Sequence, residues 1–314
     1  MLLLEEDGEL LGLMPVVRQL DYYNRPVPHI SNWFHPNCFM GSPLVAMGEE
    51  ARFWQALLDW ADNSPGTALF LHLRDLALEG PLYSTLASIL DGDGRTSSLV
   101  KSEERALLDS DLDPASYLQA SLSSRKRKDL NRRFRKLAEL GDVRFEWSTD
   151  DRGVSDWAAN FLELEASGWK GDAGSALACD PSTRRLYEAC LQGAAERGKL
   201  IRLSLLLDGK PIAMLSTFAT PPGSFGFKTA FDERYSRYSP GFLLERKYLN
   251  SLDRTDIRWC DSCAAPDHSV MNQIWSERKA IGSLSIAIGG MLRRAAFEPL
   301  NRLETTISST EPQA

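Results

Sequence analysis

The residues best suited to chemistry are Arg237-Tyr238-Ser239-Pro240-Gly241-Phe242, which stand between a strand-like run and an amphipathic run. In the run before them, Phe225, Phe227 and Thr229 alternate with smaller or polar residues, as in a half-buried strand. Serine is a favoured helix N-cap, and proline fits the first helical position, where its missing N–H costs nothing. Such a helix start presents unpaired N–H groups and a positive dipole end, which bind anions, most often phosphate. The stretch is therefore either an anion site, with Arg234 adding charge, or an ordinary helix start.

Several segments around this stretch carry a family resemblance. They are FLELEASGWKG (161–171), FKTAFDE (227–233), WCDSCAAPDH (259–268) and IWSER (274–278). With the loop, they resemble GNAT-type acyltransferases, especially the CelD-type acetyltransferases linked to bacterial cellulose and exopolysaccharide synthesis, which are related in fold to Fem-type aminoacyltransferases. The usual GNAT loop is Arg/Gln-x-x-Gly-x-Gly/Ala, whereas Pro240 and Gly241 stand here where two small residues are expected, which resembles the CelD branch. The resemblance covers residues 115–300, and the rest more weakly.

This resemblance implies a fold and an activity. The fold would be two tandem GNAT-like domains, each an α/β mixed sheet flanked by helices. Arg237–Phe242 would hold the pyrophosphate of acetyl-CoA or another acyl-CoA. The acyl group would pass to an amine or hydroxyl, on a small molecule, a saccharide or a saccharide precursor. We expect direct transfer in a ternary complex, because no cysteine has a clear base partner.

The composition limits the class of protein. A chain of 314 residues accommodates two domains, and 43% hydrophobic with 25% charged residues is typical of a soluble globular protein. No run is long enough for a membrane span, and Glu5, Glu6 and Asp7 interrupt the apolar N-terminus, so we predict no secretory signal. A net charge of -7 argues against nucleic-acid binding by the whole surface. Five cysteines favour a reducing cytoplasm over a disulfide framework.

An internal duplication is predicted from two matching hairpins. LLLEEDGELLGLMPVV at the start and KLIRLSLLLDGKPIAMLSTFA (199–219) each place two apolar runs around Asp-Gly. After each hairpin come a strand, a loop, a helix and a further strand. The first copy lacks the arginine-led turn, so we expect it to be degenerate, and its start on a bare hairpin suggests truncation. We predict a degenerate domain at 1–112, a basic helical connector at 113–141 and a catalytic domain at 142–314.

Three residues are candidates for acid or base catalysis. Asp261 ends a strand expected beside the central strand, where it orients or deprotonates a nucleophile, or only caps a turn. His268 follows in a polar turn and titrates near neutrality, although a surface histidine is the more common explanation. Glu233, with Asp232, ends the central strand, where GNAT enzymes often place a base, and both are otherwise solvated turn carboxylates.

The acceptor side is assigned to Glu165, Trp169 and Lys170, which close a helix, and to Lys228 in the central strand. A tryptophan beside glycine in a polar loop often stacks on a flat or sugar ligand, but Trp169 is equally compatible with a core position. Cys260-x-x-Cys263 raises redox or zinc chemistry. Strand alternation sends the two thiols to opposite faces, and only His268 is near as a further ligand, so we predict no metal site.

The stretch 125–136 holds eight Lys or Arg against one Asp, a local charge of +7, which leaves about -14 for the remainder. It lies in a predicted helix with an apolar stripe of Leu130, Phe134 and Leu137. Three interpretations stay open: a solvated arm between domains, a grip on nucleotide phosphates or RNA in transient contact, or contact with an anionic membrane. No stable nucleic-acid complex is expected. The alternative functions are a Fem-type aminoacyl-tRNA-dependent ligase and a non-catalytic partner in polysaccharide synthesis.

Overall fold

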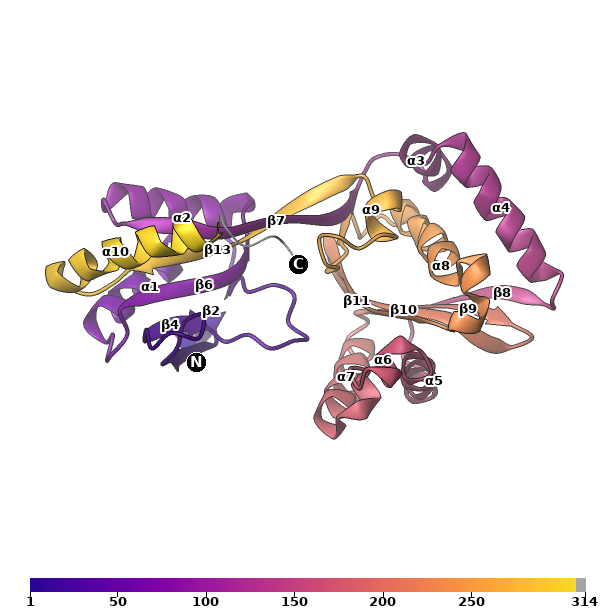
Figure 1. The fold of residues 1–314 in the computed structure, drawn as a ribbon, viewed down its shortest axis with the longest axis horizontal. Helices are drawn as coiled ribbons and strands as arrows, with labels where there is room; N and C mark the ends of the chain where they lie inside the picture. Colours follow the sequence, from indigo (N-terminus) through magenta and orange to yellow (C-terminus); the bar gives the residue numbers. More distant parts are fainter. Residues whose placement is uncertain (309–314) are drawn as a thin grey trace. The chain divides into compact units, whose positions relative to one another are not determined.

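The computed structural model describes residues 1–308, with side chains up to Asn301. It is a mixed α/β protein that divides into two compact units (Figure 1). The first unit contains residues 1–104 and the segment from residue 279 onward, and the second contains residues 105–278.

The first unit has a main sheet in the order β3-β4-β6-β13-β7 and a small sheet in the order β1-β2-β5. Its elements are β1 (Leu2–Glu6), β2 (Glu9–Met14), β3 (Val16–Gln19), β4 (His29–Asn32), β5 (Leu44–Val45), α1 (Glu50–Asn63), β6 (Phe70–Ala77), α2 (Gly80–Gly92), β7 (Ser97–Asp109), β13 (Glu277–Ala287) and α10 (Met291–Ser308). The strands β7 and β13 each continue into the second unit. Apolar residues of α1, including Phe53, Trp54 and Leu57, form a core with the sheet.

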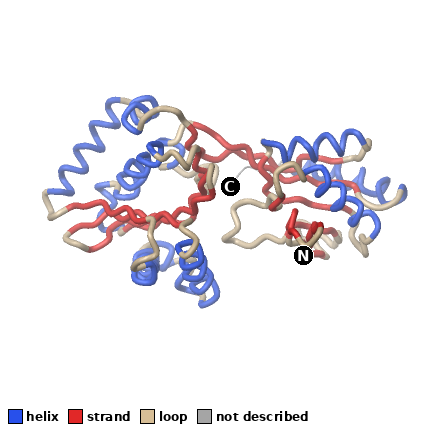
Figure 2. Tube along the Cα trace, turned by 180° about the vertical axis from the view of Figure 1, so that it is seen from behind, coloured by secondary structure: helices blue, strands red, loops and turns tan. Residues whose placement is uncertain are grey.

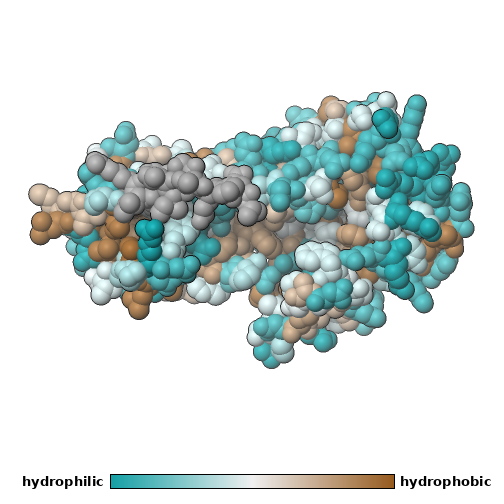
Figure 3. Space-filling model, in the orientation of Figure 1, coloured by the Kyte–Doolittle hydropathy of each residue, from teal (hydrophilic) through white to brown (hydrophobic). Residues whose placement is uncertain are grey.

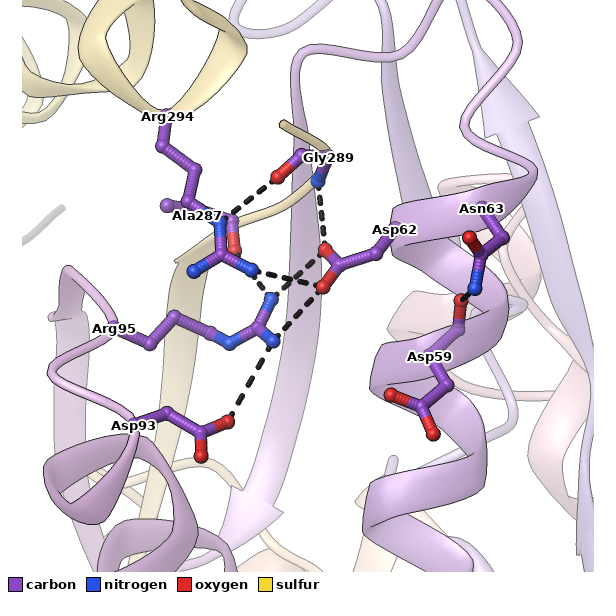
Figure 4. Close-up of polar contacts among 8 residues, drawn as sticks. All are labelled: Asp59, Asp62, Asn63, Asp93, Arg95, Ala287, Gly289 and Arg294. Carbon is purple, nitrogen blue, oxygen red and sulfur yellow. Dashed lines mark hydrogen bonds and ion pairs between the residues drawn. The ribbon is translucent and has the colours of Figure 1, made fainter. Parts of the chain in front are cut away.

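The carboxylate of Asp62, at the end of α1, ties the late part of the chain to the first unit (Figure 4). It accepts hydrogen bonds from both terminal nitrogens of Arg95 at 2.9 Å, from the N–H of Gly289 at 2.7 Å and from Arg294 at 2.9 Å. Burial would raise the pKa of Asp62, but Arg95 and these other donors hold it below its ordinary value. The segment that contains Gly289 and Arg294 is therefore an integral part of this unit.

The second unit has a sheet in the order β7-β12-β11-β10-β9-β8. Its elements are the end of β7, α3 (Pro114–Ser121), α4 (Ser124–Ala138), β8 (Val143–Ser148), α5 (Val154–Ala166), α6 (Trp169–Asp172), η1 (Leu177–Cys179), α7 (Pro181–Ala195), β9 (Leu200–Leu207), β10 (Lys210–Thr220), β11 (Gly223–Phe231), η2 (Glu233–Tyr238), α8 (Pro240–Tyr248), η3 (Leu249–Asp253), β12 (Trp259–Asp261) and α9 (Met271–Ile274). Asp113 and Asp180 cap helices whose first residue is proline, as helix-start rules predict.

Helices cover both faces of the second unit's sheet, with α5, α6 and α7 on one face and α3, α4 and α8 on the other (Figures 1 and 2). The core on the α8 side includes Leu203, Leu215 and Leu244, and the core on the α5 side includes Phe161 and Tyr187. Leu130 and Leu137 of α4 are buried in the first of these cores. The basic helix is therefore part of the second unit, and the interpretation of a solvated arm between domains is wrong.

The two copies of the predicted duplication share a topology. Both hairpins turn at Asp-Gly with positive φ at each residue, 50° and 83° at Asp7-Gly8 and 50° and 76° at Asp208-Gly209, as type I′ turns require. Each hairpin is followed by a parallel strand pair joined through a helix, β4–α1–β6 in the first copy and β11–α8–β12 in the second. The repeated order supports two GNAT-like halves.

The copies exchange their final strands. Beside β6 runs β13, which ends the second copy, and beside β12 runs β7, which ends the first copy. The compact units therefore differ from the domain bounds predicted at 112 and 141. Sequence analysis assigned neither β7 nor β13, whose pairing depends on residues far along the chain.

Candidate active site

The start of α8 has the geometry expected of an anion site. The first intrahelical hydrogen bond runs from the N–H of Leu243 to the carbonyl of Ser239 at 3.0 Å. The N–H groups of Gly241 and Phe242 precede it and have no acceptor within the helix. Pro240 occupies the first turn, as predicted, and Asp232 caps the preceding η2 by accepting from the N–H of Arg234.

Ser239 departs from its predicted role. It stands at the N-cap position, but its hydroxyl makes no capping hydrogen bond, because its backbone is left-handed with φ 56° and ψ 54°. The hydroxyl instead accepts from Nη1 of Arg133, in α4, at 2.7 Å. The same nitrogen donates to the carbonyl of Arg237 at 3.3 Å. The basic helix therefore contacts the loop directly, which sequence analysis missed, since the sequence does not show which basic residue faces inward.

The central strand β11 keeps its parallel partner over a short distance only. Gly223, Ser224 and Phe225 pair with Trp259, Cys260 and Asp261, and residues 226–231 continue past the end of β12. Gly226 lies at the point of separation, where a Cβ would stand 2.6 Å from the carbonyl oxygen of Ser262. The parallel pairing of β11 and β12 therefore ends at Phe225 and Asp261.

The predicted acceptor residues lie together. Nζ of Lys170 lies 2.8 Å from Oε1 of the buried Glu165, whose Oε2 accepts from the N–H of Leu177 at 2.8 Å. Oε1 of Glu233 accepts from the N–H of Trp169 at 2.9 Å. Trp169 is 60% exposed, which excludes a core position. Glu165 therefore orients Lys170, and Glu233 holds the tryptophan at the surface.

One small pocket of about 40 Å³ lies among these residues and the end of β11. It is lined by Glu165, Gly168, Trp169, Lys170, Thr229, Ala230, Phe231 and Glu233. The ring of Phe231 also lies 3.5 Å from the position of a Cβ on Gly241. The predicted anion loop and the predicted acceptor residues are therefore neighbours.

Lys228 and His268 are both close enough to Lys170 for its charge to affect their pKa values. Burial lowers the pKa of Lys228, nearby Lys170 lowers it further, and Glu165 opposes the shift. Packing around the ring also lowers the pKa of His268, with a contribution from Lys170, although the residue stays exposed overall. Nδ1 of His268 accepts from the N–H of Met271 at 3.2 Å. The neutral ring therefore carries its proton on Nε2, which makes it a hydrogen-bond donor rather than a base.

Asp261 has a different environment from the one predicted. It is fully buried, and both carboxylate oxygens lie 2.7 Å from guanidinium nitrogens of Arg105, in β7. Its Oδ1 also accepts from the N–H of Cys263 at 2.9 Å. A carboxylate occupied in this way favours a structural role over the predicted catalytic one. Sequence analysis missed Arg105, because β7 itself was not predicted.

Glu245, in α8, is a second buried acid that the sequence did not reveal. It is 2% exposed, neither carboxyl oxygen has a hydrogen-bond partner among the described residues, and burial raises its pKa to about 8. Burial likewise raises the pKa of the adjacent Cys260 to about 12, and its Sγ lies 3.3 Å from the hydroxyl of Tyr248. Such a thiol is a poor nucleophile.

The described part of the chain contains no group of three or more His, Cys, Asp or Glu residues able to hold a metal ion. All five cysteines lie in that part and none forms a disulfide. None of the described helices is both long and apolar enough to cross a membrane. The cytoplasmic location stays a prediction.

Comparison with known proteins agrees with the topology of the second unit. Residues 124–268, less than half of the chain, match the family model of the acetyltransferase (GNAT) domain. No curated protein shows significant sequence similarity. This segment therefore carries a GNAT-type domain, and the CelD-type assignment remains a resemblance.

Three solved structures share the fold of nearly the whole chain. FemX is 11% identical, covers 96% of this chain and 89% of its own, and has a TM-score of 0.57. The C-terminal domain (DUF2156) of a candidate lysylphosphatidylglycerol synthetase from Agrobacterium fabrum is 12% identical, with coverages of 95% and 85% and a TM-score of 0.57. A conserved protein of unknown function from Bacteroides thetaiotaomicron VPI-5482 is 9% identical, with coverages of 87% and 82% and a TM-score of 0.55. At these identities the likeness concerns the fold alone.

Proposed function

We propose that the chain is an acyl-CoA-dependent acyltransferase, with acetyl-CoA or another acyl-CoA as co-substrate. The observation that carries this proposal is that, within the GNAT-type segment, the start of α8 lies next to the predicted acceptor-binding residues. The helix start at Ser239–Phe242 has unpaired N–H groups. Phe231 contacts this helix start at Gly241 and also lines the pocket of the predicted acceptor-binding residues. The N–H groups of Gly241 and Phe242 would receive the pyrophosphate, with Arg237 adding charge. Arg234, also predicted to add charge, is instead paired with the carboxylate of Asp232 at 2.6 Å. The pantetheine arm would follow β11 past the end of β12.

The acceptor amine or hydroxyl attacks the thioester carbonyl carbon, and the carbon–sulfur bond then breaks to release CoA. Glu233 is our candidate for the base that takes the nucleophile's proton. Its Oε2 makes no hydrogen bond in the described part of the chain, while Oε1 holds Trp169. The Nε2–H of His268 is our candidate for the donor to the oxygen or sulfur that gains negative charge. Asp261 supports the strand end through Arg105 and takes no part.

We propose a saccharide, or a precursor of one, as the acceptor. The exposed ring of Trp169 offers a flat face, and the ammonium groups of Lys170 and Lys228 lie close by. Such a group favours a flat ligand with several hydroxyls and an anionic or strongly polar substituent.

A screen of amino sugars and other acceptors with acetyl-CoA, read as release of the CoA thiol, tests the proposal. Gly241→Val should abolish turnover, because the valine side chain occupies the proposed phosphate position. Its Cβ meets Phe231 at an ordinary contact distance of 3.5 Å, so folding should survive. Gly92→Val, which meets no atom within 4 Å, is the matched control. Glu233→Gln should lower kcat by about 10²-fold or more. Trp169→Ala should chiefly raise the acceptor's KM.

A second candidate function is aminoacyl transfer from tRNA, and the outer face of α4 favours it. Arg125, Lys128, Arg132, Arg135 and Lys136 fall on one side of the helix and are all exposed. Hydrophilic residues dominate the surface over α4 (Figure 3). Of these five, only Arg132 has an ion pair in the described chain, with Asp129. The fold is shared with FemX, which by itself shows nothing about substrate.

A filter-binding assay with tRNA at several salt concentrations tests this candidate. A triple variant, Arg125→Gln, Lys128→Gln and Lys136→Gln, should weaken binding uniformly and flatten the salt dependence. Binding to vesicles of anionic lipid, with no tRNA binding, would transfer the role of this face to a membrane. If neither tRNA nor acyl-CoA binds, the chain is a non-catalytic partner that keeps only the fold.

A further inference from the structure

We infer that α4 forms one wall of the phosphate site, where Arg133 and Lys126 hold the phosphates of acyl-CoA beside the start of α8. This inference rests on the proposed acyltransferase function. It adds to the site the helix α4, which is more than 90 residues before the loop Arg237–Phe242 in the sequence. It assigns two of the eight basic residues of the stretch 125–136 to the face beside the loop, apart from the five on the outer face.

Arg133 is fixed over the loop by contacts on two sides. Its Nε donates to Oδ2 of Asp129 at 2.7 Å, and its Nη1 donates to Oγ of Ser239 at 2.7 Å and to the carbonyl of Arg237. The third nitrogen, Nη2, makes no hydrogen bond within the described chain. Two nitrogens thus set the orientation of the guanidinium on the loop at Ser239, two residues before Gly241, and Nη2 stays available as a donor.

Ser239 explains why the loop needs this support. A serine in the left-handed region, at φ 56°, is strained by about 1 kcal/mol or more relative to its preferred conformations. The hydrogen bond from Arg133 stabilises that conformation, which directs the chain into α8 with its first N–H groups uncovered. Arg133 is therefore a positioning residue for the loop as well as a charge beside it.

Lys126 reaches the same loop from two helical turns earlier. Its Nζ lies 5.3 Å from the centre of the Phe242 ring. Positions 126 and 133 are seven residues apart and so share one edge of the helix. Leu130 and Leu137 anchor α4 in the core, and Phe134 stacks on Phe145 at 6.1 Å. The two cations are thus held on a rigid support, which lowers the ordering cost of binding.

Calorimetric titration with CoA, for the full-length protein and three single variants, tests the inference. Arg133→Gln and Lys126→Gln should each raise the Kd for CoA about 10-fold or more, because each removes a charge-assisted contact to phosphate. Lys136→Gln makes the same charge change on the outer face and should alter the Kd less than about twofold. Arg133→Lys should restore part of the lost affinity. Dephospho-CoA, which lacks the 3′-phosphate but keeps the pyrophosphate, identifies the phosphate concerned. A variant that weakens the binding of CoA and of dephospho-CoA equally acts on the pyrophosphate.

Acetylpantetheine, the phosphate-free half of the ligand, separates contact with phosphate from a general loss of structure. The inference requires that Arg133→Gln leave the affinity for acetylpantetheine within about twofold of the wild type. Equal weakening of both ligands would reduce Arg133 to a structural residue and overturn the inference. Unchanged CoA affinity in the Arg133 and Lys126 variants would overturn it while leaving the acyltransferase proposal intact. Absence of CoA binding in the folded wild type would overturn both.

Discussion

At the residue scale, the ion pair of Arg105 and Asp261 is buried on both sides. Both side chains are almost inaccessible, with 6% and 0% of their area exposed. Arg105→Met should destabilise the second unit by about 3–5 kcal/mol, because it leaves an uncompensated buried carboxylate. The double variant Arg105→Met with Asp261→Leu should recover most of that loss. Urea unfolding followed by tryptophan fluorescence measures both, and equal stability of the single and double variants would contradict the structural role of Asp261.

Glu245 predicts a pH dependence with a definite sign. Its pKa is 4.5 in the unfolded chain and about 8 in the folded one. Between these values only the folded state keeps the proton, so the free energy of unfolding falls as pH rises and levels off above pH 8. The loss at pH 7 is about 3 kcal/mol. Glu245→Gln should match the wild type near pH 4.5 and exceed its stability at pH 8.

Denaturation at several pH values measures this difference, with the exposed Glu139→Gln as control. Parallel stability curves for wild type and Glu245→Gln would show that Glu245 is ionised in the folded state.

The residues of the candidate site were predictable to different degrees. Glu165, Trp169, Lys170 and Glu233 line one pocket, because they flank one helix and one strand end, and their roles stay predictions. The contacts of Asp261 with Arg105, and of Ser239 with Arg133, were not predictable, since they join residues more than 100 positions apart. Local sequence patterns carry no signal for such pairs.

At the element scale, the separation of β11 from β12 depends on Gly226. A Cβ there would stand 2.6 Å from a backbone oxygen that no side-chain rotation can move. Gly226→Ala should therefore cost about 1–3 kcal/mol of stability and weaken acyl-CoA binding by shifting the strand edge. Gly92→Ala, at an open helix end, should leave both nearly unchanged. Thermal unfolding and calorimetry measure the two effects, and a normal Gly226→Ala protein would show that the edge is adaptable.

Helices and hairpins followed closely from the sequence, because caps, prolines and Asp-Gly turns act locally. The basic helix begins at Ser124 after the cap at Ser123, and of the predicted stripe it buries Leu130 and Leu137 fully and Phe134 partly. The strands β7 and β13 were missed, since charged residues interrupt their alternation.

At the scale of the whole molecule, the first unit is built from both ends of the sequence, whereas the second unit is the continuous segment 105–278 and includes the end of β7. A fragment of residues 105–278 contains the strand end that pairs with β12, including Arg105, whereas residues 113–278 lack it. The longer fragment should unfold cooperatively, and the shorter one should be less stable by about 3–5 kcal/mol or fail to fold. Denaturation of the two purified fragments measures this difference. Equal stability would show that β7 is dispensable for the second unit.

The tandem organisation could be predicted from the repeated hairpins, but the bounds of the units could not. The predicted boundary at 112 divides the chain into two consecutive domains. In the structure, most of β13 and the following α10 belong to the first unit, although they come after the second unit in the sequence. That return is fixed by contacts such as those of Asp62 with Gly289 and Arg294, more than 200 residues away.

Calorimetric titration of the full-length wild-type protein with acetyl-CoA tests the central claim most directly. We expect binding with one site per chain and a micromolar Kd, and a gain of about 2.7 kcal/mol in unfolding free energy at a hundredfold excess over that Kd. Loss of the signal in Gly241→Val would place the ligand at the start of α8. A folded wild-type protein that gives no heat and no stabilisation with acetyl-CoA would contradict the account.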